Sequence, residues 1–303
     1  MVGSGTGGAA AGARSIDGRA LSARVREDIA RRVRSLNDRG VRVELDAVIA
    51  TDDMHSASNV YVKNQRKTCE ALGIAYRLHQ MSGSAGYDEI AGRVLLLSND
   101  PDVTAIMVHL PLPEAVDSYK VQSLIAPAKD VEGVNPANIG NIVYGRKSLA
   151  PCTALAVMRL IESTGVDLKG KRALVVGASN IVGKPIAVML MRPEATVLST
   201  NKHTAGLPAL AREADVLIAA AGVPKLVTAE WVKPGAVVID VGIHRVEVDD
   251  GEGGTKRVTV GDVDAESVGP VAGFLSPVPG GVGPATVAML LENTVAAAER
   301  AMP

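Results

Sequence analysis

Aromatic side chains and cysteines are scarce in this sequence. Phe, Trp and Tyr make up 2% of its 303 residues, with one Trp and one Phe, so a flat ligand must be held mainly by aliphatic walls and polar groups. The two cysteines, Cys69 and Cys152, are too few for a disulfide framework and lack the spacing of a metal site. We therefore expect no metal.

An excess of one charge and a long apolar run are also missing. The net charge is −1, so the basic footprint of a nucleic-acid-binding protein is absent. No apolar run approaches the roughly 18 residues of a membrane helix, and the N-terminus does not resemble a signal peptide. Hydrophobic residues still make up 47% of the chain, and its length suits about two folded domains. These features predict a globular cytoplasmic protein with no nucleic-acid or membrane partner.

Apolar periodicity predicts two units in which strands and helices alternate. Residues 1–14 are largely Gly, Ala and Ser and are expected to form a disordered leader. In the first unit the predicted strands are 41–50, 74–81 and 103–110, and the predicted helices are 17–39, 58–72, 87–97 and 118–125, with a long loop over 127–149. In the second the predicted strands are 195–200, 215–221 and 236–242, and the predicted helices are 152–163, 182–191, 207–214, 228–232 and 284–300. This alternation predicts an α/β fold with parallel sheets.

The stretch from Leu174 to Pro185 organises the second unit. A β-branched apolar run stops at Gly177, polar residues follow, and Gly183 opens a new apolar pattern, which predicts a strand, a tight turn and a helix N-terminus. Such a turn directs backbone N–H groups and the positive end of a helix dipole at one point, where a phosphate can bind. The spacing differs from G-x-G-x-x-G, so the pattern alone is also compatible with a turn that binds nothing. The candidate cofactor contacts in this turn are Gly177, Ala178, Ser179, Asn180, Ile181 and Val182.

The end of the next predicted strand bears on the choice of dinucleotide. NAD-selective sites usually place a carboxylate there for the ribose diol, but the sequence runs Ser199-Thr200-Asn201-Lys202-His203-Thr204. Lys202 could meet a ribose phosphate, which favours NADP over NAD, or could be an ordinary exposed lysine.

Polar residues of the first unit also cluster after predicted strands. Tyr61 and Gln65 are four residues apart on one predicted helix and share a face, as they would on an ordinary surface helix. His109 ends a strand and could be structural or could titrate near neutrality. Asp130 and Glu132 are either solvated charges or carboxylates that pair with an amino-heterocycle or a proton.

Together these segments resemble the bifunctional methylenetetrahydrofolate dehydrogenase/methenyltetrahydrofolate cyclohydrolase family. The resemblance runs from Ile16 to the terminal helix, nearly the whole chain. The segments that carry it are Ser58-Asn59-Val60-Tyr61-Val62, Leu110-Pro111-Leu112-Pro113, Lys129-Asp130-Val131-Glu132-Gly133, Pro151-Cys152-Thr153, Gly177 to Pro185, Asp240-Val241-Gly242-Ile243, Gly261-Asp262-Val263 and Pro277 to Pro284.

The resemblance implies two domains with a folate-binding interdomain cleft, usually in a homodimer. The folate-binding catalytic domain would comprise residues 15–150 and 284–303, and a Rossmann-like domain for NADP, or possibly NAD, would comprise 151–283. A tetrahydrofolate derivative would be the substrate. The implied catalytic residues are Tyr61, Gln65, His109 and Glu132. The implied folate contacts are Tyr61, Leu110, Pro111, Glu132, Pro277, Gly280 and Gly281. Further implied cofactor contacts are Lys202, Thr204, Gly222 and Ile243.

Among the departures from the family pattern, three fall at implied catalytic positions. Gln65 replaces the catalytic lysine, His109 replaces a glutamine, and Glu132 replaces an aspartate. Hydride transfer chiefly needs two correctly placed ligands, whereas adding water to the methenyl carbon needs proton transfers, for which a carboxamide is unsuited. We therefore expect an oxidoreductase of one-carbon metabolism with weak or absent cyclohydrolase activity.

Two other interpretations remain open from the residues. The altered positions could fit another folate-bound one-carbon unit or heterocycle in a specialised pathway. Alternatively, the chain could be a non-catalytic paralogue that binds a nucleotide.

Overall fold

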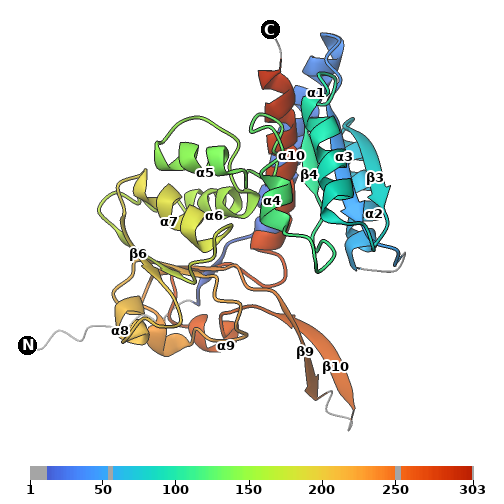
Figure 1. The fold of residues 1–303 in the computed structure, drawn as a ribbon. Helices are drawn as coiled ribbons and strands as arrows, with labels where there is room; N and C mark the ends of the chain where they lie inside the picture. Colours follow the sequence, from blue (N-terminus) through green and yellow to red (C-terminus); the bar gives the residue numbers. More distant parts are fainter. Residues whose placement is uncertain (1–11, 54–56, 250–253, 302–303) are drawn as a thin grey trace, which may run out of the picture. The chain divides into compact units, whose positions relative to one another are not determined.

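The computed structural model describes residues 12–53, 57–249 and 254–301, which fold into two compact units (Figure 1). The three-stranded unit contains Ala20–Ala156 and the described residues from Ala285 onward. The six-stranded unit contains the described residues up to Arg19 and Val157–Pro284. The predicted α/β fold with parallel sheets is confirmed. None of the described helices is long and apolar enough to span a lipid bilayer.

The three-stranded unit is built on a parallel sheet in the order β3 (Ala75–Met81), β2 (Glu44–Ala50), β4 (Ile106–Val108). All seven residues of β2 are buried, as expected for the central strand of a sheet covered on both faces. The helices α1 (Gly18–Asp38), α2 (Ala57–Ala71), α3 (Tyr87–Asn99), α4 (Ser118–Gln122), α5 (Pro136–Val143) and α10 (Val282–Arg300) lie wholly or mostly in this unit. Helix α6 (Cys152–Glu162) begins in this unit and ends in the six-stranded one. The Arg32 guanidinium of α1 donates two hydrogen bonds of 2.8 Å to Glu299 of α10, which joins these two helices side by side (Figure 1).

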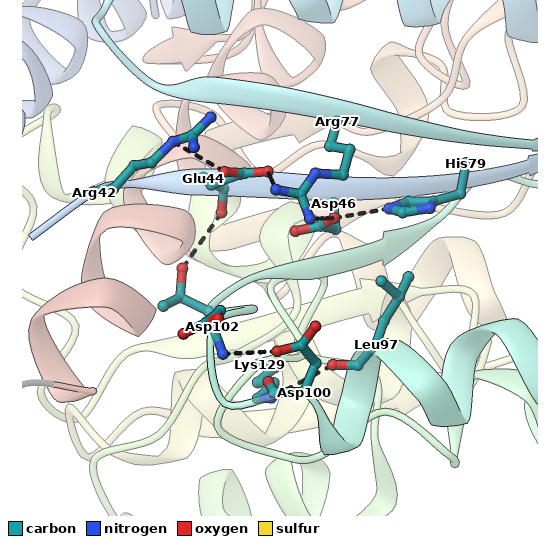
Figure 2. Close-up of polar contacts among 10 residues, drawn as sticks. Arg42, Glu44, Asp46, Arg77, His79, Leu97, Asp100, Asp102 and Lys129 are labelled. Atoms are coloured by element: carbon teal, nitrogen blue, oxygen red, sulfur yellow. Dashed lines mark hydrogen bonds and ion pairs between the residues drawn. The ribbon is translucent and has the colours of Figure 1, made fainter.

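One face of the sheet changes in polarity along β2. Val48 and Ala50 pack against apolar residues of the α3 and α4 segments. On the same face, Glu44 and Asp46 are buried and pair with residues of β3 (Figure 2). Arg77 lies 2.7 Å from Glu44, and His79 lies 2.7 Å from Asp46. These partners offset the cost of burying two carboxylates, so the cluster has a structural explanation.

The six-stranded unit has a fully parallel sheet. Its order is β1 (Arg14–Ser15), β11 (Phe274–Leu275), β8 (Val237–Asp240), β7 (Val216–Ala219), β5 (Arg172–Val176), β6 (Thr196–Thr200). Helices α7 (Gly183–Met191), α8 (Leu207–Ala211) and α9 (Ala265–Val268) and the 3-10 helix η1 (Ala229–Trp231) connect these strands. The chain runs from β5 to β6 on one side and returns to β7 on the other, so the strand order reverses at β5. In open parallel sheets, ligands bind beyond the carboxyl ends of strands at such a reversal.

Several local expectations needed correction. The segment 127–149 is not one irregular loop, because the Asn135 side chain caps α5 and Pro136 occupies its first turn. Residues 228–232 form only the short 3-10 helix η1, and the strand expected over 103–110 shortens to β4. The hairpin of β9 (His244–Asp249) and β10 (Thr255–Val260), which projects from the six-stranded unit in Figure 1, was not predicted.

The N-terminal boundary also differs from the expected one. Residues 1–11 of the expected leader lie outside the described residues. Arg14 and Ser15 pair with Phe274 and Leu275, so the chain enters the six-stranded sheet before reaching α1.

Candidate active site

The turn between β5 and α7 has the form of a phosphate cradle. Gly177 has φ +106°, and a Cβ there would lie 2.1 Å from the Ala220 carbonyl oxygen. A Cβ on Gly183 would lie 1.9 Å from the Gly177 oxygen. Only glycine fits either position, so the close approach of strand, turn and helix depends on both. The Ser179 hydroxyl accepts a hydrogen bond from the Gly183 N–H. Ser179, Asn180 and Ile181 are all exposed.

A buried carboxylate holds the neighbouring loop in place. One oxygen of Asp262, Oδ2, accepts hydrogen bonds from the N–H groups of Ala221 (2.6 Å) and Gly222 (2.9 Å), just after β7. The other, Oδ1, lies 2.7 Å from His244 Nε2. Asp240 in turn accepts hydrogen bonds from the Asp262 and Val263 N–H groups. The role of Asp262 in positioning Gly222 could not be predicted from the sequence, because it depends on contacts between distant segments.

The carboxyl end of β6 carries the other dinucleotide candidates. Lys202 is exposed, and the Thr204 hydroxyl accepts a hydrogen bond from the Asn201 N–H, which fixes the turn. Ile243, after β8, is 70% exposed, which is unusual for a large apolar residue and leaves its side chain free for a flat ligand.

The segment before α10 is tightly packed. A Cβ on Gly18 would lie 1.8 Å from the Gly281 oxygen, so the segment depends on glycine at the start of α1. Pro277 is half-buried, while Gly280, with φ +122°, and Gly281 are buried. The Gly281 N–H donates to the Pro277 oxygen at 2.8 Å, which closes the turn.

The structure divides the roles within residues 129–133 of the three-stranded unit. Lys129 Nζ donates to the carbonyl oxygen of Asp100 at 2.6 Å (Figure 2). It also donates to the Ser98 oxygen at 2.9 Å and thereby caps α3. Asp130 is fully buried and accepts hydrogen bonds from the Gly133 and Asn135 N–H groups. These two residues therefore build the loop, and Glu132 is the carboxylate left for ligand chemistry.

Glu132 is placed at the carboxyl end of the sheet. Its Oε2 accepts a hydrogen bond of 3.2 Å from the Val108 N–H at the end of β4. Burial raises the pKa of Glu132 to about 7; the Val108 hydrogen bond partly opposes this shift, and the nearby Asp130 charge adds to it. Glu132 can therefore gain or lose a proton near neutrality.

Cys152 and Asn293 form hydrogen bonds with the backbone next to Glu132. Cys152 Sγ donates to the Val131 oxygen at 3.2 Å, and Asn293 Nδ2 donates to the same oxygen at 2.8 Å. Asn293 also donates to the Ala150 oxygen at 3.0 Å. The Pro-Cys-Thr segment thus contributes to the placement of Glu132.

The structure brings Tyr61, Gln65 and His109 into one cluster. The rings of Tyr61 and His109 meet edge to face, with centroids 5.7 Å apart. Tyr61 is 40% exposed, and Leu110 and Pro111, the next residues after His109, are also exposed. These side chains form an accessible surface beside the buried imidazole.

Of the two alternatives for His109, the structure favours a structural imidazole over one that titrates near neutrality. The side chain is buried, and this burial lowers the pKa of His109 to about 4. The imidazole is therefore neutral at pH 7 and cannot serve there as a ready proton donor.

Gln65 is engaged with protein groups. It is 3% exposed, its Oε1 accepts a hydrogen bond of 3.0 Å from the Tyr76 hydroxyl, and its Nε2 lies 3.1 Å from Met107 Sδ. Tyr76 also lies 3.4 Å from His109 Nε2. Sequence analysis missed Tyr76, because only the sheet register brings residue 76 next to residues 65 and 109.

Within the described residues, no group of three His, Cys, Asp or Glu side chains is arranged to hold a metal ion. The candidate residues belong to two sets, one in each unit. Tyr61, Gln65, His109, Leu110, Pro111 and Glu132 lie in the three-stranded unit, and the turn at 177–182, Lys202, Thr204, Gly222, Ile243, Pro277, Gly280 and Gly281 lie in the six-stranded unit.

Comparison with known proteins agrees with this arrangement. Residues 16–132 match the family model "Tetrahydrofolate dehydrogenase/cyclohydrolase, catalytic domain", and residues 151–302 match the corresponding NAD(P)-binding domain. The bifunctional protein FolD of Moorella thermoacetica is 46% identical over 288 residues, covering 95% of this chain and 99% of the relative. The FolD of Bordetella avium is 47% identical, covering 96% and 99%.

Solved structures give the same result. The bifunctional FolD dehydrogenase/cyclohydrolase of Campylobacter jejuni superposes with a TM-score of 0.87 at 39% identity, covering 95% of this chain and 99% of that one. The Trypanosoma brucei enzyme, solved with NADP and an inhibitor, has a TM-score of 0.87 at 35% identity, covering 96% and 98%. The chain belongs to the tetrahydrofolate dehydrogenase/cyclohydrolase family.

Proposed function

We propose that this protein is an NADP-dependent 5,10-methylenetetrahydrofolate dehydrogenase that also hydrolyses methenyltetrahydrofolate, the second reaction being the slower one. The observation that carries the proposal is the match over 95% of the chain to relatives named as bifunctional. These names favour the presence of both activities over the complete loss of one.

The proposed dinucleotide site consists of the β5–α7 turn, the loop at Gly222 and the end of β6. NADP, when bound, supplies the hydride acceptor. The glycine-dependent turn brings the end of β5 close to the N-terminus of α7, where backbone N–H groups favour a phosphate. Lys202 supports NADP over NAD, because an ammonium group suits a ribose phosphate and the segment 199–204 contains no carboxylate. The NADP bound to the Trypanosoma brucei relative supports the same choice.

The proposed folate site in the three-stranded unit uses Glu132, Tyr61, Leu110 and Pro111. Folate contacts by Pro277, Gly280 and Gly281 stay a prediction from the family resemblance. An ionised Glu132 can accept hydrogen bonds from the N–H groups of a pterin ring. The exposed ring of Tyr61 and the exposed Leu110 and Pro111 offer apolar contact area. We also propose that Glu132, Tyr61, Leu110 and Pro111 belong to a catalytic domain of 15–150 and 284–303, and that Pro277, Gly280 and Gly281 belong to a dinucleotide domain of 151–283.

The slower hydrolysis follows from proton chemistry. Water addition and ring opening need a group that gives and takes protons, and the carboxamide of Gln65 does neither at any accessible pH. His109 is held neutral by its low pKa of about 4. Losing one general acid or base typically costs about a hundred- to ten-thousand-fold in rate. Hydride transfer depends on geometry and bound ligands, so it is spared.

A two-stage assay tests the proposal. The purified protein is mixed with 5,10-methylenetetrahydrofolate and NADP or NAD, and reduced nicotinamide and the methenyl chromophore are followed together. We expect steady NADPH formation, faster than with NAD, and transient accumulation of the methenyl product. Absence of hydride transfer would refute the enzyme assignment and favour a non-catalytic paralogue. Turnover of this substrate far below that of the bifunctional relatives, measured in parallel, would favour a different folate-bound unit.

A further inference from the structure

The Tyr76 hydroxyl bridges two positions that distinguish this chain from the family pattern. It lies 3.0 Å from Gln65 Oε1 and 3.4 Å from His109 Nε2. The register of the parallel sheet explains the meeting. Tyr76 aligns with Leu45 of β2, and Met107 of β4 aligns with Ala47, two residues along the same face. His109 is two residues beyond Met107 and so shares that face, which also contacts Gln65 of α2.

The contacts that link Met107, Gln65, Tyr76 and His109 form a series. The chemistry of each group determines whether it donates or accepts a hydrogen bond in this series. A thioether sulfur only accepts hydrogen bonds, so the Gln65 amide nitrogen faces Met107 and its oxygen faces Tyr76. The Tyr76 hydroxyl has one proton, which it donates to that oxygen. Its own oxygen is then free to accept, and the ring atom within reach is His109 Nε2, which can donate to it in the Nε2–H tautomer.

The protonation states of the two rings agree with this order. Burial raises the pKa of Tyr76 far above its ordinary value, so the hydroxyl keeps its proton. Burial lowers the pKa of His109 to about 4, so the imidazole carries one N–H at neutral pH. A neutral histidine with a donor at Nε2 has an acceptor at Nδ1.

We propose that Tyr76 is a positioning residue that couples residue 65 to His109, and that the acceptor at residue 65 fixes His109 in the Nε2–H tautomer. His109 then offers the unprotonated Nδ1 as its acceptor atom, beside the exposed ring of Tyr61. The consequence for catalysis rests on the proposed function: residue 65 contributes no proton to hydrolysis but sets the hydrogen-bonding character of a residue in the folate site. A donor at residue 65, such as a lysine, would reverse the chain of hydrogen bonds.

Nitrogen NMR of the full chain labelled with 15N-histidine tests the tautomer without any ligand. The chain has five histidines, so the His109 signals are assigned by their loss in His109→Gln. We expect a protonated Nε2 and an unprotonated Nδ1 at pH 7 in the unsubstituted protein. In Tyr76→Phe the preference should disappear, and exchange between both tautomers should average the signals.

The decisive variant is Gln65→Met, which keeps the side-chain length but offers only a weak acceptor. The Tyr76 hydroxyl should then donate its hydrogen bond to His109 Nε2, and His109 should change to the Nδ1–H tautomer. Gln65→Leu serves the same purpose if the first variant does not fold. An Nδ1–H tautomer in the unsubstituted protein, or an unchanged tautomer in a folded Gln65 variant, would overturn the proposal.

The KM and kcat of variants at Tyr76 distinguish a positioning role from a general loss of structure. Tyr76→Phe should raise the KM for the folate about threefold or more while the kcat of hydride transfer changes less than twofold. Tyr119→Phe, at a residue of α4 that is 63% exposed, is the matched control and should change neither value nor the His109 signals. A fall in kcat equal to the loss of folded protein, with KM unchanged, would contradict a positioning role. A protein that turns over no folate would refute the proposed function, whereas the NMR result would still decide the coupling.

Discussion

Replacing Glu132 by glutamine should change two properties that can be measured separately, the affinity for the folate and the stability of the fold. The pKa of Glu132 is raised to about 7, mainly by burial. If the ionised carboxylate is the form that binds the pterin, its population sets the apparent affinity. For a pKa of 7, the ionised fraction falls about tenfold between pH 8 and pH 6, so the KM for the folate should rise about tenfold.

Glu132→Gln should remove this pH dependence. The amide oxygen can still accept from the Val108 N–H, but no charge remains for the pterin. The KM should be high and nearly constant from pH 6 to pH 8. Glu114→Gln, at an exposed position of the same unit, is the control and should keep the profile of the unsubstituted protein. A tenfold change in KM that persists in Glu132→Gln would refute the role of Glu132.

The same substitution should stabilise the fold at high pH. The folded-state pKa of Glu132 is about 7, above its ordinary value of 4.5, so folding favours the protonated form. The stabilising contribution of protonated Glu132 is therefore fully present below pH 4.5 and is lost as the pH rises towards 7. Each unit of pKa difference corresponds to about 1.4 kcal/mol, so ionised Glu132 costs the folded state about 3 kcal/mol at pH 8. Urea unfolding should show Glu132→Gln to be more stable at pH 8 and unchanged at pH 4; equal stability at pH 8 would contradict this account.

Three further substitutions test other parts of the site. Gly177→Ala should weaken NADP binding at least tenfold in a fluorescence titration, because Cβ would lie 2.1 Å from a carbonyl oxygen, whereas Gly165→Ala, with a similarly positive φ but open space, should leave it unchanged. Lys129→Met should lower the free energy of unfolding in urea by about 1 kcal/mol through loss of the α3 cap, and no change would refute that role. Lys202→Asp should raise the KM for NADP and lower that for NAD; equal effects on both would show that Lys202 does not read the ribose phosphate.

Much of the fold could be predicted because its central strands contain apolar runs, which cover residues 47–50, 173–176 and 216–219. Strands β2, β5 and β7 are buried along nearly their whole length, and glycines stop the segments around them. The β9–β10 hairpin was missed although Val246 and Val248 alternate with charged residues, a pattern typical of an exposed strand pair. The two-residue strands β1 and β11 leave no detectable periodicity.

Candidate residues for the site could be named from the sequence, but their structural roles could not. Lys129, Asp130 and Glu132 look alike as a charged loop, and only the hydrogen bonds distinguish a helix cap, a loop organiser and a carboxylate available to a ligand. The low pKa of His109 arises from burial by segments distant in sequence. Tyr76 has no motif at all, since its importance arises from contacts with residues 65 and 109.

The central claim is that this chain transfers a hydride well but hydrolyses the methenyl product slowly, because residue 65 carries no ionisable amine. The most direct measurement is the ratio of the two kcat/KM values, with methenyltetrahydrofolate supplied directly and its uncatalysed hydrolysis subtracted. We predict that hydrolysis is at least a hundredfold slower than hydride transfer. The double variant Gln65→Lys/His109→Gln introduces the residues that the family resemblance implies at both positions. It should raise the kcat/KM of hydrolysis relative to that of hydride transfer. Hydrolysis as fast as hydride transfer in the unsubstituted protein would contradict the account.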